Sequence, residues 1–197
     1  MLRRHFSTPV SASSLSDFQA VTVDDITSAI RRLTSKHCVS EPIPSHLLVS
    51  IVDDTASFLT ALYNNSLHNG VVPESNKSAY ISSLLKKSNL DLADVKSYRP
   101  ISNLSVTSKL LEILVAKQMV SHLKAHDLLS RMQSAYRRGH ATVTAVTKVL
   151  SDIFIAIDRS DFAALALSLT AAFDTVDNDI LLKRLHSCFG VSGRVLS

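Results

Sequence analysis

Apolar side chains recur at helical spacing through much of the chain, and this periodicity constrains the fold more than any other feature of the sequence. After Thr142, the apolar residues within 146–157 step alternately by three and one, which is typical of a helix with one apolar face. The segment Thr22-Val23-Asp24-Asp25 resembles a capping box and precedes further apolar residues at helical spacing. With only four glycines among 197 residues, an all-β fold built on many tight turns is disfavoured.

Three more helices and two strands complete the expected architecture. One long helix is expected over 47–70, and Ser108 is a candidate cap for another. Residues 79–85 and 162–169 are apolar enough to form strands, and a helix resumes near Asn178. The sequence therefore predicts a helix-rich α+β fold in one compact unit, without an internal repeat or linker.

The net charge of +4 is unevenly distributed along the chain. Residues 77–148 contain 12 Lys and Arg against four Asp and Glu, a formal charge of +8, while 1–76 and 149–197 each carry −2. A basic region suits a polyanion, because each neutralised phosphate releases counterions. A solvated Lys and Arg surface is the alternative, and charge alone does not decide between the two.

Composition argues against several other classes of protein. The chain has no Trp and only 6% aromatic residues, which weakens the case for a base-stacking platform. No apolar stretch approaches the roughly 20 residues that span a membrane, so no membrane partner is expected. Cys38 and Cys188 form no disulfide framework and fit a reducing, intracellular compartment, without distinguishing nucleus from cytoplasm.

One block of sequence is distinctive. Ser97-Tyr98-Arg99-Pro100-Ile101-Ser102-Asn103-Leu104 is similar to the Tyr-Arg-Pro-Ile-Ser block of reverse transcriptases from non-LTR (LINE-type, jockey-like) retrotransposons. Four further blocks resemble that family in the same order, at 42–48, 108–112, 133–142 and 171–177. The resemblance covers about residues 18–193, and five blocks in family order are more specific than any one of them.

The resemblance implies an incomplete reverse transcriptase domain, containing the fingers and first palm strand of a right-hand polymerase. On that basis we expect a disordered N-terminus over 1–17, an N-terminal helical extension over 18–76, fingers over 77–160 and the start of a truncated palm over 161–197. The family is an RNA-directed DNA polymerase, a nucleotidyltransferase that uses two divalent metals, usually Mg²⁺, held by acidic side chains. An RNA or RNA/DNA template is the expected partner.

The metal-binding pattern of the family is broken in this sequence. Ser168 stands where the resemblance places the first metal-binding Asp, and a neutral hydroxyl compensates the repulsion of two cations poorly. The family's later aromatic-Ala-Asp-Asp motif does not occur in the 197 residues. We therefore expect no bound cofactor and no polymerase activity from this chain, and no small-molecule substrate without a complete palm. The pairs Asp24-Asp25 and Asp53-Asp54 are interpreted as helix starts rather than as metal ligands.

The remaining candidate site residues are basic or aromatic. The resemblance implies that Arg99 and Phe173 contact the nucleotide, Arg99 through phosphate and Phe173 as a gate against the sugar. The pairs Lys86-Lys87 and Arg137-Arg138 are candidates for lining the template path. The alternatives are a core position for Phe173, an acidic helix end as the partner of Arg99, and solvated surfaces for the basic pairs. A non-catalytic RNA-binding module that uses 77–148 is therefore the alternative function.

Three further features favour structural interpretations. His122 and His126 have the i,i+4 spacing of zinc ligands, but without a third ligand they are expected to be exposed helix residues. Asp174 and Asp177 lie near the expected site, and Asp174 is expected to have a structural role, such as capping the next helix, rather than to bind a metal. Asn76 stands where the family usually has Trp, which predicts a loosened local core.

Overall fold

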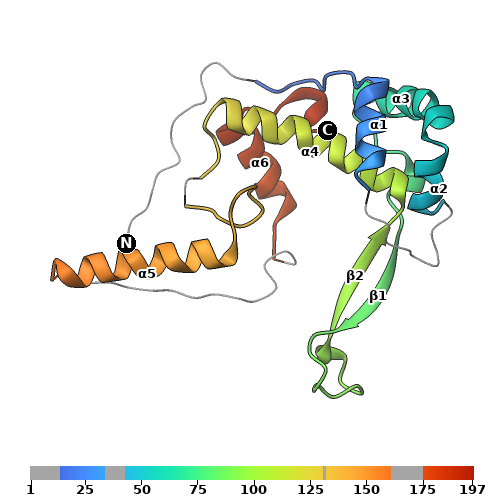
Figure 1. The fold of residues 1–197 in the computed structure, drawn as a ribbon. Helices are drawn as coiled ribbons and strands as arrows, with labels where there is room; N and C mark the ends of the chain where they lie inside the picture. Colours follow the sequence, from blue (N-terminus) through green and yellow to red (C-terminus); the bar gives the residue numbers. More distant parts are fainter. Residues whose placement is uncertain (1–13, 34–42, 131, 161–174) are drawn as a thin grey trace.

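The computed structural model describes residues 14–33, 43–130, 132–160 and 175–197, and it confirms a helix-rich α+β fold (Figure 1). In the described residues, six helices and one hairpin of two strands account for the regular structure, together with three short 3₁₀ turns. The helices are α1 (Val23–Arg31), α2 (Ser45–Ser50), α3 (Val52–Asn69), α4 (Val106–Ala125), α5 (Thr142–Asp158) and α6 (Asn178–Phe189). The 3₁₀ turns are η1 (Glu74–Asn76), η2 (Val95–Ser97) and η3 (Gly193–Val195), and the strands are β1 (Ala79–Leu85) and β2 (Tyr98–Leu104).

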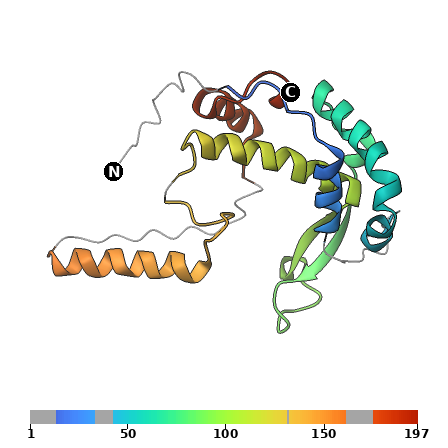
Figure 2. The same ribbon diagram turned by 45° about the horizontal axis from the view of Figure 1, so that its top comes forward.

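The hydrophobic core lies where α1 contacts α2, α3 and α4 (Figure 2). Ile26 and Ile30 of α1 are fully buried, one turn apart on the same face of the helix. Leu110 of α4 and Tyr63 of α3 are buried with them. The apolar faces that the sequence predicts for these three helices are thus directed at one another.

The helix starts follow local hydrogen-bonding rules. Thr22 caps α1 in a capping box, in which its hydroxyl accepts from the Asp25 backbone and the Asp25 carboxylate accepts from the Thr22 backbone. The long helix expected over 47–70 is divided, because Ile51 leaves helical geometry at φ −110° and ψ 21° between α2 and α3. Gly70 then ends α3 in the left-handed conformation, at φ 65°.

Two expected helix caps are corrected. The cap of α4 is Ser105 rather than Ser108, since the Ser105 hydroxyl accepts a hydrogen bond from the Ser108 backbone at 3.2 Å. Thr142 is the first residue of α5 rather than its cap, and Ala141 occupies the cap position. Helices α1, α2, α4, α5 and α6 begin within three residues of their predicted starts, whereas the sequence predicts no separate start for α3 at Val52.

The strands form an antiparallel hairpin that projects from the helical core (Figure 1). β1 coincides with the expected strand over 79–85. The sequence does not predict β2 as a strand, because its residues stand out only as a family motif. The register pairs Ala79 with Leu104 at the root and Leu85 with Tyr98 at the far end. The other expected strand, over 162–169, lies outside the described residues.

The two ends of the described chain meet. Leu15 forms a parallel bridge with Val191, and the Asp17 carboxylate accepts a hydrogen bond from Arg194 at 2.9 Å. The sequence predicts a disordered N-terminus over 1–17, and these contacts show that residues 14–17 are ordered. Near this pairing, the η3 turn contacts α3.

As in α6, no side chain of helix α5 is buried. Its apolar residues include Phe154 and Ile157, which are 62% and 60% exposed. Figures 1 and 2 show α5 lying apart from the helical core. The described part of the chain is therefore not the single compact unit that the sequence predicts.

Candidate nucleic-acid interface

The β1–β2 hairpin presents Arg99 to solvent. Arg99 pairs with Leu84 across the hairpin, so both side chains lie on one face of it. Arg99 is exposed, and within the described residues its guanidinium makes no hydrogen bond or ion pair. A free guanidinium keeps its full set of donors for a phosphate, which it can bind through two parallel hydrogen bonds.

The hairpin loop that follows β1 uses Lys86 and Lys87 differently. The Lys86 ammonium donates to the Lys96 carbonyl at 2.6 Å, and the Lys86 backbone donates to Ser97, which closes the loop. Lys87 is exposed, and its ammonium has no partner among the described residues. Lys86 therefore stabilises the loop while Lys87 remains available for an anion.

The second basic pair lies in the loop between α4 and α5. Arg137 donates to the carbonyl of Ser130 at 2.9 Å and to that of Gln133 at 3.3 Å, so its guanidinium folds the loop back on itself. Arg138 is exposed, with no partner for its guanidinium in the described chain. Gly139 follows in a left-handed conformation at φ 81°, as a tight turn requires.

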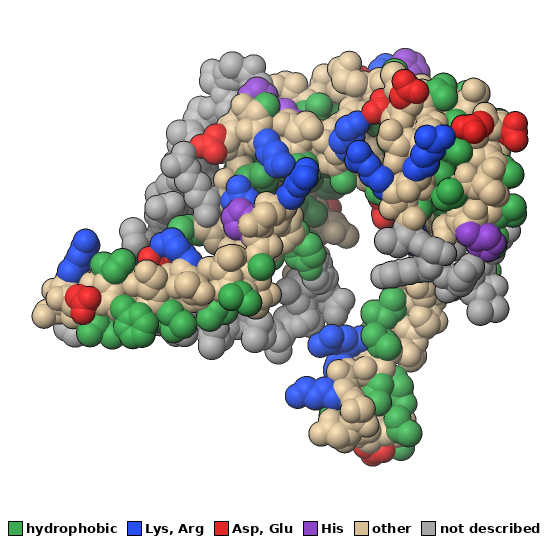
Figure 3. Space-filling model, viewed as in Figure 1, with side chains coloured by type: hydrophobic (Ala, Val, Ile, Leu, Met, Phe, Trp, Pro, Cys, Tyr) green, Lys and Arg blue, Asp and Glu red, His purple; other side chains and the backbone are tan. Residues whose placement is uncertain are grey.

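Several other cations of the basic 77–148 region are already neutralised. Lys77 pairs with Glu74 at 3.0 Å, Lys148 pairs with Asp152 one turn along α5, and Lys117 lies 2.7 Å from Asp25. The Lys117 ammonium and the Thr22 hydrogen bonds lower the pKa of the Asp25 carboxyl to about 2. Figure 3 shows Lys and Arg side chains gathered over the helical body and on the side of the hairpin turned toward α5.

The acidic pairs lie at helix starts, as the sequence predicts. Asp24 and Asp25 are in the first turn of α1, and Asp53 and Asp54 are in the first turn of α3. Asp53 also forms an ion pair with Arg31 at 3.5 Å. These carboxylates lie at the positive ends of the helix dipoles, and Asp25 and Asp53 also pair with cations on other helices.

Asp177 caps α6, since its carboxylate accepts a hydrogen bond from the Ile180 backbone at 3.0 Å, whereas the sequence points to Asp174 as the cap. Ser168, Phe173 and Asp174 lie outside the described residues. Where the structure describes the chain, no group of three or more His, Cys, Asp or Glu side chains is arranged to hold a metal ion.

Two structural interpretations made from the sequence are wrong. His122 is not exposed: it is buried on α4, its Nε2 lies 2.8 Å from the Phe189 carbonyl, and its ring meets that of His126 edge-on at 4.8 Å. Asn76 does not loosen its surroundings, because it is buried and its side-chain oxygen accepts a hydrogen bond from Thr107 at 3.1 Å. Nothing in the sequence identifies Thr107 as the partner of Asn76. The hydroxyl residues Ser105, Thr107 and Ser108 signal only that α4 starts in this region.

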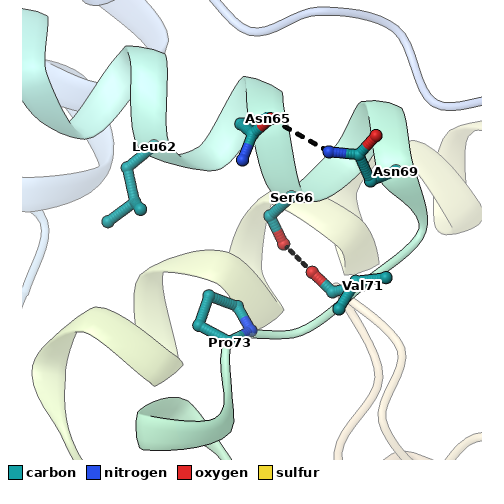
Figure 4. A pocket seen from close by; sticks show the side chains of 6 residues that line it. All are labelled: Leu62, Asn65, Ser66, Asn69, Val71 and Pro73. Carbon is teal, nitrogen blue, oxygen red and sulfur yellow. Dashed lines mark hydrogen bonds between the residues drawn. The ribbon is translucent and has the colours of Figure 1, made fainter.

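The pocket drawn in Figure 4 has a volume of about 380 Å³ and lies between α3 and the segment after it. Its polar side chains bond within the protein: Asn69 donates to Asn65 at 2.9 Å, and Ser66 donates to the Val71 carbonyl at 2.6 Å. No charged residue lines it; the lining residues are Leu62, Asn65, Ser66, Asn69, Val71 and Pro73. Because no cation lines this pocket, it is not part of the candidate nucleic-acid interface.

The motif-bearing hairpin and its free cations are found in a chain whose curated relatives are RNA-directed DNA polymerases of mobile elements, which confirms the resemblance noted in the sequence. One relative is the RNA-directed DNA polymerase from mobile element jockey of Drosophila melanogaster, 27% identical over 172 residues, or 86% of this chain and 19% of the relative. A second is the probable RNA-directed DNA polymerase from transposon BS of the same species, 29% identical over 171 residues, again 86% and 19%.

A third relative, the probable RNA-directed DNA polymerase from transposon X-element of Drosophila melanogaster, is 28% identical over 148 residues, or 75% of this chain and 16% of the relative. The chain thus spans less than a fifth of the length of the curated relatives it matches. No protein-family model matches the sequence. Across the part of the chain that the structure describes, no helix is long and apolar enough to cross a membrane.

Proposed function

We propose that this chain is the nucleic-acid-binding fingers and the beginning of the palm of a reverse transcriptase domain of non-LTR retrotransposon lineage. The assignment of 77–160 to the fingers and 161–197 to the palm rests on the order of the family motifs. Similarity to RNA-directed DNA polymerases over 75–86% of the chain supports the lineage. An RNA or RNA/DNA template is the partner that such a lineage uses.

The observation that carries this proposal is the division of the basic region into paired and free cations. Arg99, Lys87 and Arg138 are exposed and have no partners among the described residues, whereas Lys117 and Lys148 are ion-paired. Free cations on the projecting hairpin and on the loop between α4 and α5 can neutralise phosphates of a nucleic-acid strand. Cations already paired with carboxylates release fewer counterions when they meet nucleic acid.

Binding of a single-stranded RNA, measured by fluorescence anisotropy between about 50 and 200 mM salt, tests the proposal. We expect affinity to fall steeply with salt, and the log–log slope to fall by about one in Arg99→Gln and in Arg138→Gln. Lys148→Gln is the matched control: it removes the same charge from the same region, but from an ion pair, and is expected to leave the slope nearly unchanged. Binding that is independent of salt, or equal slopes in all variants, would contradict the interface.

A non-catalytic role in RNA binding is the second candidate, and Ser168 favours it. The resemblance places Ser168 where the family has a metal-binding Asp, so we propose that this chain does not extend a primer on an RNA template. A primer-extension assay with Mg²⁺ or Mn²⁺ checks the proposal. Template-dependent synthesis by the purified chain would overturn it, whereas RNA binding without synthesis is the expected result.

A further inference from the structure

The direction of the β1–β2 hairpin depends on how its root is attached. β1 is exposed along nearly its whole length, and the extensive contacts of each strand are with the other strand. A strand of seven residues is about 23 Å long, so a rotation of about 15° at the root moves the far end by about 6 Å. Any cation on the hairpin can meet a strand reproducibly only if the root is fixed.

A hydrogen-bond network joins both ends of the hairpin to the first turn of α4. Asn76 precedes β1, and its side-chain oxygen accepts from the Thr107 hydroxyl at 3.1 Å while its backbone carbonyl accepts from the Ser108 hydroxyl at 2.9 Å. Ser105 follows β2, and its hydroxyl lies 2.7 Å from that of Ser108 and 3.0 Å from that of Thr107. The chain entering the hairpin and the chain leaving it thus share the same partners.

The network is also tied to the core. The Tyr63 hydroxyl, on α3, donates to the Thr107 backbone carbonyl at 3.1 Å, and Tyr63 is only 1% exposed. Asn76 and Ser108 are 8% and 4% exposed. A buried polar group without a hydrogen-bond partner is destabilising, so the bonded arrangement is preferred over one in which the hairpin is turned away.

We propose that Asn76 and Thr107 are positioning residues, which fix the direction of the hairpin relative to the helical core and thereby fix where Arg99 and Lys87 meet a nucleic-acid strand. The second half of this proposal rests on the proposed function; the first half does not. Neither residue contacts the nucleic acid in this scheme. Both act through the orientation of the hairpin.

The distance between two spin labels, measured by pulsed electron paramagnetic resonance on the full chain, tests the orientation. The labels are attached through Leu92→Cys in the hairpin loop and Phe58→Cys on α3, both 70% exposed, after Cys38→Ser and Cys188→Ser. We expect one narrow distance distribution, which broadens or shifts by several ångströms in Thr107→Val because that variant lacks the hydroxyl. Thr107→Ser keeps the hydroxyl and is expected to restore the narrow distribution.

Thr60→Val is the matched control, because the Thr60 hydroxyl bonds to the Ala56 carbonyl within α3. It is expected to leave the distance unchanged. Should circular dichroism show that Thr107→Val is unfolded, Thr107→Ala removes the same hydroxyl without introducing an apolar branch. An unchanged distance distribution in a folded Thr107→Val or Thr107→Ala variant would overturn the proposal.

RNA binding separates this inference from the function on which it draws. With Arg99 and Lys87 intact, Thr107→Val is expected to bind RNA several-fold more weakly than the unaltered chain, while Thr60→Val binds equally well. Absence of RNA binding by the unaltered chain would refute the proposed function and leave the distance measurement to decide on the orientation. Unchanged RNA affinity alongside a shifted distance would refute the link between orientation and binding.

Discussion

Helices α1 and α5 both carry a clear apolar face, yet only α1 buries it. Ile26 and Ile30 of α1 are completely enclosed between α3 and α4, whereas Phe154 and Ile157 of α5 are more than half exposed. The apolar pattern of α5 is longer than that of α1, so the length of the pattern does not account for the difference. Periodicity defines which face of a helix is suited to burial, and a partner from elsewhere in the chain is needed to bury it.

A pair of leucine truncations gives the largest expected contrast between the two regions. Leu110→Ala, in the core, is expected to lower the free energy of unfolding by about 3 kcal/mol, because it removes buried contacts and leaves a cavity. Leu150→Ala, on α5, is expected to change it by less than about 0.5 kcal/mol, since Leu150 is 47% exposed. Urea unfolding followed by circular dichroism measures both. Equal losses would mean that the apolar face of α5 is buried in solution.

A pair of glycine substitutions gives a smaller contrast, between the packed C-terminal side of the core and the open loop before α5. A Cβ at Gly70 would lie 2.9 Å from the Arg194 carbonyl, while one at Gly139 would meet nothing within 4 Å. Both glycines have positive φ, so each substitution to Ala costs about 1–2 kcal/mol of backbone strain. Gly70→Ala is expected to cost about 1 kcal/mol more than Gly139→Ala in thermal unfolding, because the carbonyl must also move. The reverse order would contradict the close approach of η3 to the end of α3.

The sequence predicts the elements better than it predicts their pairing. β1 is recognisable from its apolar residues, but β2 contains Pro100 among Ser and Asn, which are poor strand formers. Its strand conformation comes from pairing with β1, and proline is tolerated in a two-stranded hairpin because each strand has a free edge. The helix caps show the same limit, since Ser105 and Ser108 are equally good caps by type and only the observed hydrogen bond distinguishes them.

The candidate interface was predictable in its residue types but not in its division of roles. Arg137 and Arg138 are adjacent and identical, yet only Arg137 is held by backbone carbonyls. The left-handed conformation of Tyr136, at φ 59°, turns the chain at that point, and nothing in the sequence signals it. His122 shows the same limit, because the Phe189 carbonyl that it contacts lies 67 residues away and cannot be inferred from spacing on α4.

The ion pair between Asp25 and Lys117 joins α1 to α4, and no such link is observed for α5 within the described residues. Because the folded state lowers the pKa of Asp25 from 3.8 to about 2, its carboxylate contributes stability above about pH 4 that is lost as pH falls through about 2. Asp25→Asn is expected to cost about 1 kcal/mol at pH 7, the usual loss for a capping interaction, since the pair is partly exposed and screened.

Urea unfolding at several pH values separates the contribution of the Asp25 charge from that of its side-chain geometry. Asp24→Asn is the matched control: Asp24 lies in the same first turn and forms no ion pair with a described residue, so its loss is expected to be smaller. The difference between the two variants, from urea unfolding at pH 7, 5 and 3, should shrink at the lowest pH as the unaltered chain begins to lose its charged carboxylate. A difference that does not depend on pH would assign the effect to the cap's geometry and remove the ion pair from the account of how α1 is held to α4.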